Sequence, residues 1–481
     1  MNKPIGRLFV VALLMFGALL VSTSWWTVLR ADALNHDTNN RIELFRALKI
    51  KRGTIRAADG TAIARSIRDP EGVYHRTYPK GKLFGHPVGY SYSGIGQTEL
   101  ERYRNDALMG KTDAITTTVD HLLGKKPQGS DVRTNLDSKA QELALREIEA
   151  LGKDGAAVAL DPRTGAVKVM ASTPGYDPNI VKDTKALQAL SLDEGHKPLV
   201  NRAVQFGDAP GSTFKVVTAT AAIDTGAFSP NSPVNGDNAV KISGVPLAND
   251  FAQSFGTIDL RTGLAKSVNT VFAQVGEKLG KATMKSYMER FGFDKKPELD
   301  YPRDSMSASV VAPNPPGHPV SPTSRFVDVG RMSIGQGGLQ ATPLQMAQVA
   351  AAVANGGRLM KPRLTDRIID PDGRTKDRIA PALQSTVMKP STAAAVTDMM
   401  TAVVQSGTGT KAQIPGTQVA GKTGTAETEI GGKINNVWFI GFAPAQSPRV
   451  AVAVYVRGVQ GFGGDFAAPI ARDIMEELLK R

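Results

Sequence analysis

The chain has 481 residues, more than one typical hydrophobic core holds, so two or three domains are expected. With 41% hydrophobic and 21% charged residues the composition is that of a folded protein. The chain has no cysteine, which excludes disulfides, thiolate metal sites and cysteine nucleophiles, and its six histidines show no ligand spacing, so we expect no metal site. The net charge of +13 is spread along the chain without a dense basic block, which argues against a nucleic-acid partner.

The first segment is typical of a membrane anchor. Residues 8–29 are 22 residues without a charge, and as a helix they span about 33 Å, enough to cross a bilayer. Lys3 and Arg7 precede the segment, while Trp25 and Trp26 suit its outer interface. We therefore expect a cytoplasmic tail at 1–7, a single transmembrane anchor at 8–29, and the bulk of the chain outside the cytoplasmic membrane. A cleaved signal peptide is the alternative, but the segment is long for one and no A-x-A site follows it.

Residues 30–150 indicate an irregular α+β module. The stretches 52–55 and 61–64 flank Asp59-Gly60, a dipeptide typical of hairpin turns. Apolar residues then recur at helical spacing over 135–151, which predicts a helix leading into the next module.

Residues 151–481 predict a second, larger domain. Apolar stretches at 156–160 and 166–170 bracket a turn, and a second such pair lies at 437–440 and 450–456. Between the pairs the pattern is mostly helical, with one helix marked by Thr342 as N-cap, Pro343 in the first turn and Gly356 past the end. Residues 467–480 predict another helix, and 311–322, with five prolines, must be a loop. The fold class is therefore multi-domain α+β, with an antiparallel sheet completed by both ends of the second domain, flanked by helices, plus an all-helical part.

A serine and a lysine stand three residues apart at a predicted helix start. Ser212-Thr213-Phe214-Lys215 is the only S-x-x-K in the chain and opens a helical run over 216–223. Positions i and i+3 face the same way, so the lysine amine is expected within reach of the serine hydroxyl. A serine needs an adjacent base to attack a carbonyl, and a lysine of lowered pKa can be that base. Alone, the tetrapeptide is more often a helix start with a solvent-facing lysine.

Two further triplets carry possible chemistry. Lys422-Thr423-Gly424 is the only K-T-G and follows an extended stretch, so on a sheet edge it could offer backbone N–H groups and a positive charge to a peptide. Ser267-Val268-Asn269 precedes one apolar face of a helix, which could place both polar side chains in a cleft. A second S-x-N triplet, at 229–231, lies in a Pro/Asn-rich turn and is set aside. Alone, each has an ordinary structural explanation as a turn, a strand end or an N-cap.

The order of the three motifs changes their weight. S-x-x-K, S-x-N and K-T-G follow one another at separations of 55 and 155 residues, which is the signature of penicillin-binding proteins and serine β-lactamases. The chain resembles a class B penicillin-binding protein over nearly its whole length. Further segments similar to that class are 52–60, 76–79, 94–110, 155–179, 201–203 and 438–442. One departure is Val268, which stands where a small polar residue is often found.

The resemblance implies a monofunctional peptidoglycan D,D-transpeptidase that works through a serine acyl-enzyme and is inhibited covalently by β-lactams. It implies that residues 30–150 form a pedestal and 151–481 the transpeptidase domain. Carried over by motif, the catalytic residues are Ser212 as nucleophile, Lys215 as its base and Ser267 as proton relay. The substrate-binding residues are Asn269, Lys422, Thr423, Gly424 and Thr425, and the N–H groups of Ser212 and Thr425 form the oxyanion hole. No cofactor is implied. The implied partners are stem peptides, β-lactams and a membrane glycosyltransferase of the SEDS type.

Three alternatives remain open. A serine β-lactamase shares all three motifs, although no E-x-x-L-N run lies between Ser267 and Lys422 and such an enzyme has no use for an anchor. A D,D-carboxypeptidase differs only in admitting water instead of an amine. A silent β-lactam sensor or division scaffold would not need both lysines and the relay serine. The 120 or so residues ahead of the second domain are few for an additional glycosyltransferase beside a pedestal.

Overall fold

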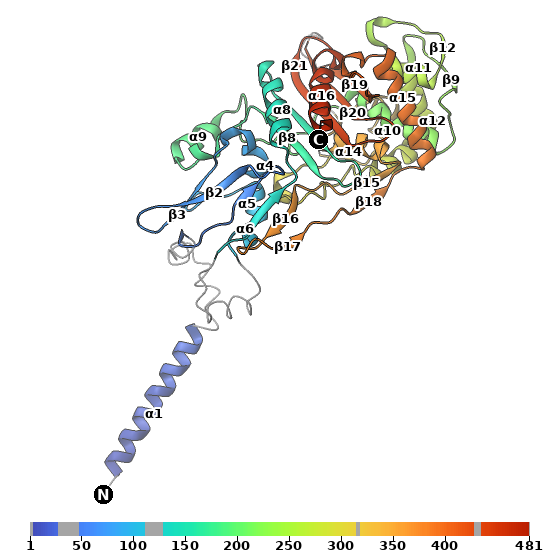
Figure 1. Ribbon diagram of the computed structural model, residues 1–481. Coiled ribbons are helices and arrows are strands. Elements are labelled where there is room, and N and C mark those ends of the chain that lie inside the picture. The colour runs from blue at the N-terminus through green and yellow to red at the C-terminus, as the bar shows by residue number, and fades with distance from the viewer. Residues whose placement is uncertain (1–2, 27–47, 111–127, 314–317, 428–433, 481) are drawn as a thin grey trace.

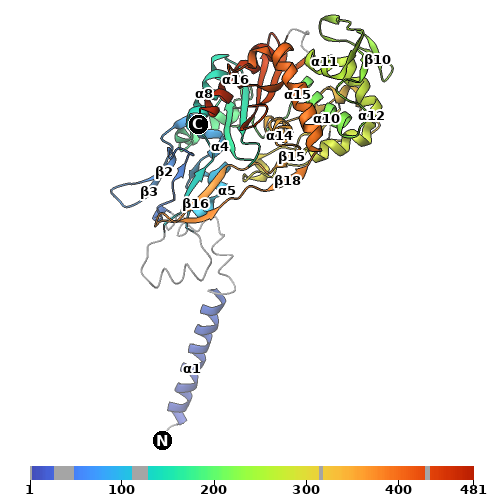
Figure 2. The ribbon, with the colours of Figure 1, turned by 45° about the vertical axis from the view of Figure 1, so that its right-hand side comes forward.

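The computed structural model describes residues 3–26, 48–110, 128–313, 318–427 and 434–480. It shows a long N-terminal helix, α1 (Lys3–Ser24), standing apart from a two-lobed body (Figure 1). The lobe nearer α1 carries β2, β3 and β17, and the far lobe carries the helices α10, α11, α12 and α15 (Figures 1 and 2).

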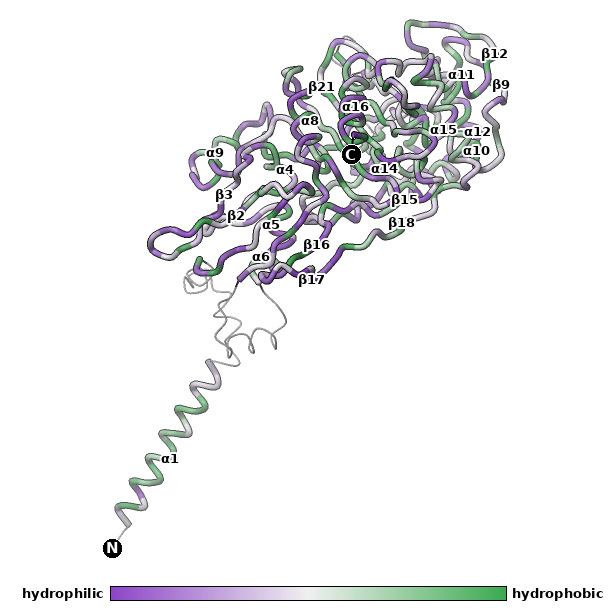
Figure 3. Tube along the Cα trace, in the orientation of Figure 1, coloured by the Kyte–Doolittle hydropathy of each residue, from purple (hydrophilic) through white to green (hydrophobic). Residues whose placement is uncertain are grey.

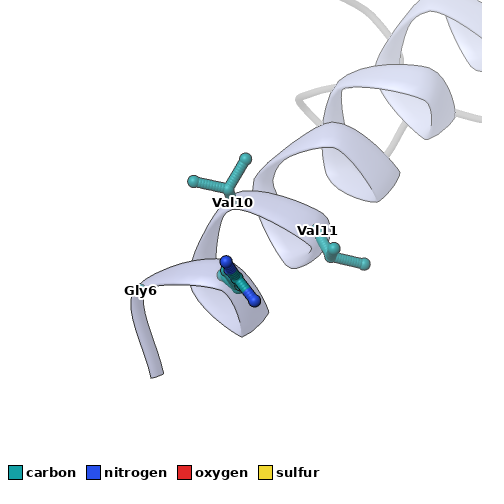
Figure 4. Close-up of a pocket in the computed structure, with 4 residues that line it drawn as sticks. Gly6, Val10 and Val11 are labelled. Atoms are coloured by element: carbon teal, nitrogen blue, oxygen red, sulfur yellow. The ribbon is translucent and has the colours of Figure 1, made fainter. Parts of the chain in front are cut away.

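Helix α1 is apolar and exposed along its length. Its residues from Pro4 to Ser24 have a mean hydropathy of 2.3 with none of the window buried, which is long and apolar enough for a membrane span (Figure 3). A shallow hollow on it is lined by Gly6, Arg7, Val10 and Val11, with Val10 and Val11 projecting outward from the helix (Figure 4). The helix begins five residues earlier than the uncharged segment, because Lys3 and Arg7 are good helix formers whatever their charge. It ends at Ser24, before Trp25. Residues 27–29 of the expected span lie outside the described residues.

The lobe nearer α1 is built on a six-stranded sheet of order β17-β16-β6-β1-β2-β3. The hairpin expected around Asp59-Gly60 is confirmed, since Ile55 pairs with Ala64 and Gly60 takes a φ of +90°. Two strands come from far along the chain, and they were not expected in this lobe because pairing over more than 200 residues leaves no local pattern. The strands are β1 (Ile55–Arg56), β2 (Ala62–Arg68), β3 (Tyr74–Thr77), β6 (Asp131–Thr134), β16 (Thr365–Ile369) and β17 (Thr375–Arg378).

Short elements follow β3 in the chain. They are η2 (Gly81–Phe84), α4 (Gly85–Val88), β4 (Ser91–Tyr92), β5 (Gly96–Gln97), α5 (Glu99–Tyr103) and α6 (Asn105–Leu108). The helix predicted over 135–151 is α8 (Ser138–Ala150), capped by Asp137, which accepts hydrogen bonds from the N–H groups of Lys139 and Ala140. Its apolar face packs on the sheet of the second domain, so the two parts of the chain share a core.

The central sheet has the order β19-β20-β21-β7-β8, all antiparallel. Its strands are β19 (Ala420–Glu427), β20 (Asn435–Ala443), β21 (Val450–Val459), β7 (Gly155–Leu160) and β8 (Val167–Thr173). The prediction that both ends of the domain complete one sheet is therefore confirmed. Alternate residues of β21 join two different apolar clusters, because successive side chains point to opposite faces. Helices α8 and α16 (Gly463–Leu479) cover one face, and α14 (Pro343–Ala354) covers the other.

The all-helical part packs beyond α14. Its main helices are α10 (Lys215–Asp224), α11 (Leu260–Ala265), α12 (Asn269–Arg290), α13 (Val329–Ser333) and α15 (Pro390–Ser406). Thr342 caps α14 by accepting a hydrogen bond from the Gln345 N–H, and Gly356 follows the helix at a φ of +64°, as expected. Smaller elements are η3 (Pro178–Ile180), α9 (Thr184–Leu192), η4 (Gly211–Phe214), β9 (Pro233–Asn235), β10 (Val240–Ile242), β11 (Val245–Leu247), η5 (Asp250–Ala252), β12 (Thr257–Asp259), η6 (Arg303–Ser305), β13 (Val310–Val311), β14 (Leu339–Gln340), β15 (Arg358–Met360), β18 (Leu383–Thr386) and η7 (Thr410–Ala412). The proline-rich stretch begins at the end of β13, and its residues 314–317 lie outside the described residues.

Candidate active site

Ser212 lies in a tight turn held against the edge strand of the central sheet. It belongs to η4, which leads directly into α10, so the predicted helix start is confirmed. Gly211 before it takes a φ of +52°, and a Cβ there would lie 2.6 Å from the Thr425 carbonyl oxygen and 3.2 Å from the Thr425 nitrogen. The turn thus needs glycine both for its conformation and for its close approach to β19.

An aspartate that the motif reading missed anchors the segment before this turn. Asp208 Oδ2 accepts hydrogen bonds of 2.6 Å from both the Tyr455 hydroxyl and the Asn436 side-chain amide. Its backbone pairs with Ala341 on the other side. These contacts tie the segment before the nucleophile turn to β20 and β21.

Lys215 is fully buried, and its amine faces the S-x-N motif. Nζ donates to the Ser267 carbonyl oxygen at 2.6 Å, to Asn269 Oδ1 at 2.7 Å and to Ser267 Oγ at 3.4 Å. Within the described part of the chain no hydrogen bond joins Lys215 to Ser212, and the Ser212 hydroxyl has no hydrogen-bond partner. A carbonyl and an amide oxygen are the better acceptors for the amine, and nucleophile–base contacts often tighten only when substrate binds.

Ser267 stands between α11 and α12 in a left-handed conformation, with a φ of +61°. This conformation is uncommon for serine and turns its hydroxyl toward the two lysines. Val268 has its side chain in the apolar core, which explains why the middle position of the motif need not be polar. Asn269 opens α12, and its side-chain amide donates to the Ala248 carbonyl oxygen at 3.1 Å and to Asp250 Oδ1 at 3.3 Å.

The K-T-G motif lies on β19, so the extended stretch predicted there is confirmed, and β19 is an edge strand of the central sheet. Lys422 is fully buried, and its Nζ donates to Ser267 Oγ at 2.9 Å and to the Thr423 carbonyl oxygen at 3.0 Å. Thr423 Oγ1 lies 2.6 Å from Thr408 Oγ1. A Cβ at Gly424 would lie 2.7 Å from the Pro210 carbonyl oxygen, so glycine lets β19 pass close to the nucleophile turn. Thr425, half-buried beside Gly211, accepts a 3.4 Å hydrogen bond from the Gly463 N–H.

Hydrogen bonds therefore join Lys215, Ser267, Asn269, Lys422 and Thr423 directly. Strand β19, which also carries Gly424 and Thr425, lies against the turn that holds Ser212, so the eight residues singled out from the sequence lie in one site. The S-x-N triplet that was set aside lies elsewhere, in an exposed turn where the Ser229 N–H bonds Ser232 Oγ. Within the described ranges no group of three or more potential metal-ligating side chains occurs.

Burial and one carboxylate set the pKa values of the two lysines in the site. Burial lowers the pKa of Lys215 to about 7, and the charge of Asp250 partly opposes this. Burial, reinforced by the charge of Lys215, holds the pKa of Lys422 well below its usual range, and Asp250 again opposes. Burial is the leading cause of the lowered pKa of both amines.

Two aromatic rings near the cleft had no sequence signal. Phe251, next to Asp250, is 77% exposed and takes a φ of +55°. Its ring lies against Phe462, with centroids 5.3 Å apart. Phe462 directly precedes Gly463, which bonds Thr425, so the pair joins the Asn269 side of the cleft to the Thr425 side.

An antiparallel sheet flanked by helices, with S-x-x-K, S-x-N and K-T-G brought into contact, defines the class of active-serine proteins that penicillins acylate. The family model described as penicillin binding protein transpeptidase domain matches residues 155–476, and that described as penicillin binding protein A dimerisation domain matches 52–132. The chain belongs to the penicillin-binding protein transpeptidase family, among its class B members.

Individual relatives match over the full length. The peptidoglycan D,D-transpeptidase PbpA of Mycolicibacterium smegmatis is 34% identical over 510 residues, covering 100% of this chain and 99% of that protein. The crystal structure of PBPA from Mycobacterium tuberculosis, 32% identical, covers 90% of this chain and 100% of its own with a TM-score of 0.80. A penicillin G acyl-enzyme complex of the same protein matches with a TM-score of 0.80 over 89% of this chain, at 32% identity.

Proposed function

We propose that this protein is a peptidoglycan D,D-transpeptidase that cross-links stem peptides through an acyl-enzyme on Ser212 and is inhibited covalently by β-lactams. The observation that carries the proposal is the contact between three motifs far apart in sequence. Lys215 and Lys422 both donate to Ser267 Oγ, at 3.4 and 2.9 Å, beside the turn that holds Ser212. The full-length relatives named as D,D-transpeptidases support the same function.

In the first half-reaction Ser212 Oγ attacks the carbonyl carbon of the penultimate D-alanine in a donor stem. Its proton passes to the neutral amine of Lys215, whose pKa of about 7 leaves a large fraction unprotonated at neutral pH. The N–H groups of Ser212 and Thr425 stabilise the oxyanion. The C–N bond then breaks, and Ser267 relays a proton to the departing D-alanine amine.

In the second half-reaction the amine of an acceptor stem attacks the acyl-enzyme. It loses a proton to the same base, and the Ser212 ester bond breaks to regenerate the hydroxyl. Asn269 holds the donor peptide, and Lys422, Thr423 and Thr425 bind the region of its terminal carboxylate, with Gly424 letting β19 lie close. No step of this scheme calls for a cofactor.

The location follows from the N-terminal helix. We propose that α1 anchors the protein as a single-pass span, with residues 1–7 in the cytoplasm, a span over 8–29 and the rest outside. The chain would then carry a pedestal in 30–150, completed by strands β16 and β17, and a transpeptidase domain in 151–481. A SEDS-type membrane glycosyltransferase would supply the nascent glycan strands that this enzyme cross-links.

The test of the proposed function compares an amine with water as the acceptor. The full-length protein in neutral detergent is given a stem pentapeptide ending in D-Ala–D-Ala, with and without an acceptor stem. We expect amide product to dominate over hydrolysed tetrapeptide when acceptor is present. Hydrolysis alone would indicate a D,D-carboxypeptidase. A parallel sample receives penicillin G in place of the stem peptides. Rapid release of hydrolysed penicillin would indicate a β-lactamase, and stable acylation by penicillin without any peptide product would indicate a sensor or scaffold.

A further inference from the structure

A large cavity in the lobe nearer α1 lies outside the active site. Its volume is about 910 Å³, and it is bounded by β2, β3, the β4–β5 hairpin and α6, together with Leu48 and Ile50. These elements form the end of the body that lies nearer α1 (Figures 1 and 2). The active-site scheme makes no use of this space.

The lining is cationic on one part and apolar on another. Arg52, Arg76, Arg102, Lys182 and His75 line the cavity, whereas no aspartate or glutamate of the described residues does. Carboxylates outside the lining pair with two of these groups, Asp304 with Arg102 and Asp69 with His75. The apolar part consists of half-buried side chains: Leu48, Ile50, Tyr74, Tyr92, Ile95 and Met109. A ligand that fits both parts combines a negative head with an apolar chain.

Beneath the wall lies a buried cluster with a surplus positive charge. Glu101 is fully buried and accepts from Arg52 Nε at 2.8 Å and from Arg76 Nε at 2.6 Å. Two guanidinium groups therefore share one carboxylate. Burial is the main cause of a lowered pKa of Arg52, opposed by the charge of Glu101 and reinforced by that of Arg76.

One guanidinium in this cluster also has a donor to spare. Every nitrogen of Arg52 is bonded, to Glu101 or to Asn105. Arg76 Nη1 donates to the Gly53 carbonyl oxygen at 2.7 Å, but its Nη2 is buried with no partner among the described residues, in a side chain that is only 4% exposed. A buried donor without an acceptor is costly, and a shift of this guanidinium toward the cavity that Arg76 lines would let an anion accept its hydrogen bond.

We propose that this cavity binds a lipid phosphate, with the phosphate drawn to Arg76, Arg102 and Lys182 and the chain on the apolar part. Arginine favours phosphate because its planar fork matches the oxygen geometry. The ligand could come from a membrane phospholipid or from a polyprenyl phosphate, since both present a phosphate ester on an apolar chain.

The experiment measures binding of dodecyl phosphate to the full-length protein in dodecyl maltoside, by microscale thermophoresis. The double variant Arg102→Gln/Lys182→Gln removes two exposed cations of the lining, and we expect its Kd to rise about tenfold or more. The matched control is Arg65→Gln, which removes one charge from the opposite face of β2, next to the lining residue Ser66. Its Kd should stay at the parent value, and penicillin acylation should be intact in all variants.

A second variant and two competitors complete the test. Arg76→Gln should abolish the binding if it folds, and the double variant decides the matter if it does not. Phosphatidylglycerol and a polyprenyl phosphate are added in turn, and displacement of the probe by either supports the site and shows which source it prefers. Saturable binding that is equal in the parent and the double variant, or displacement by neither lipid, would overturn the proposal.

Discussion

Two buried lysine amines share one hydroxyl in the cleft, and their protonation is the residue-scale feature on which the chemistry depends. Both donate to Ser267 Oγ, so the low-polarity site cannot easily hold two charges. Lys215 has a pKa of about 7, with burial as the main cause. The base is therefore active in its neutral form, above that pH.

The first prediction concerns the pH profile of acylation. Below pH 7 the neutral fraction of Lys215 falls about tenfold per pH unit, so the second-order rate constant for penicillin acylation should fall likewise and level off above pH 7. Because the charge of Asp250 raises the pKa of Lys215, Asp250→Asn should move the midpoint to lower pH. Stopped-flow measurement with a chromogenic β-lactam gives both midpoints. A midpoint that stays in place in Asp250→Asn, or moves upward, contradicts the assignment of Lys215 as the titrating base.

The second prediction separates the two lysines. Lys215→Ala removes the general base, so the acylation rate constant should drop by about 10²–10⁴-fold with the fold intact. Lys422→Ala should chiefly raise the β-lactam concentration needed for half-maximal acylation, with some loss of rate because Lys422 also bonds Ser267. A β-lactam ester without the carboxylate should already be poor with the parent protein, and Lys422→Ala should make it little worse. Equal harm to the ester and the carboxylate compound would mean that Lys422 supports the nucleophile only.

At this scale the sequence predicted the motif residues but not their supports. The three motifs are short and ordered, so they can be found without a structure. Asp208 and Asp250 carry no motif, and their roles arise from contacts such as the bond of Asp208 to Tyr455, 247 residues away. Such contacts depend on the finished fold, and no local pattern announces them.

At the scale of elements, the site depends on how closely η4 approaches β19. Gly211 and Gly424 both lie at this contact, where a Cβ would meet backbone atoms of the opposite element at 2.6 and 2.7 Å. The approach brings the turn that holds Ser212 against Thr425. A small displacement of reacting groups can cost about 10²-fold in rate.

The third prediction tests this contact. Gly211→Ala should reduce acylation by about 10²-fold or more, because the methyl group forces η4 away from β19. The control is Gly226→Ala, since Gly226 follows α10 at a φ of +76° with nothing within 4 Å of an added Cβ. Both variants carry a similar conformational cost of about 1–2 kcal/mol from the positive φ. Gly211→Ala should lower the unfolding temperature further, because its methyl group also meets the backbone of Thr425. If the two variants are acylated at the same rate, close approach of η4 to β19 is not required.

The elements themselves divide by the range of their pairing. The strands at the two ends of the second domain, α14 with its Thr342 cap and α8 were predicted, because apolar periodicity and caps are local. Strands β16 and β17 were not assigned to the first lobe, because β16 pairs with β6 across more than 200 residues. The same long-range pairing joins the two lobes, which a division of the sequence at residue 150 does not show.

At the scale of the whole molecule, α1 precedes a body in which two strands from the second half of the chain complete the sheet of the lobe nearer α1. One apolar cluster also contains buried residues from both parts of the chain. The helix is apolar and exposed throughout, which is costly in water and favourable in a bilayer. A retained span would hold the lobe nearer α1 at the membrane surface, with the active site farther from the membrane.

The fourth prediction concerns this anchor. The mature protein should keep its N-terminal residues and fractionate with membranes, and a protease added outside the cell should digest the body while sparing residues 1–7. Mass spectrometry of the purified mature protein identifies its first residue. A mature N-terminus beyond residue 22, or a soluble exported form as the main species, would show that the helix is a cleaved signal.

The central claim is that Ser212 is the residue that forms the acyl-enzyme. The most direct measurement is intact mass spectrometry of the full-length protein after incubation with penicillin G, followed by peptide mapping of the adduct. We predict one added penicillin per chain, carried by the peptide that contains Ser212, with no adduct in Ser212→Ala and an unchanged one in Ser229→Ala. An adduct mapped to Ser267 or Ser229, or one that persists in Ser212→Ala, would contradict the account.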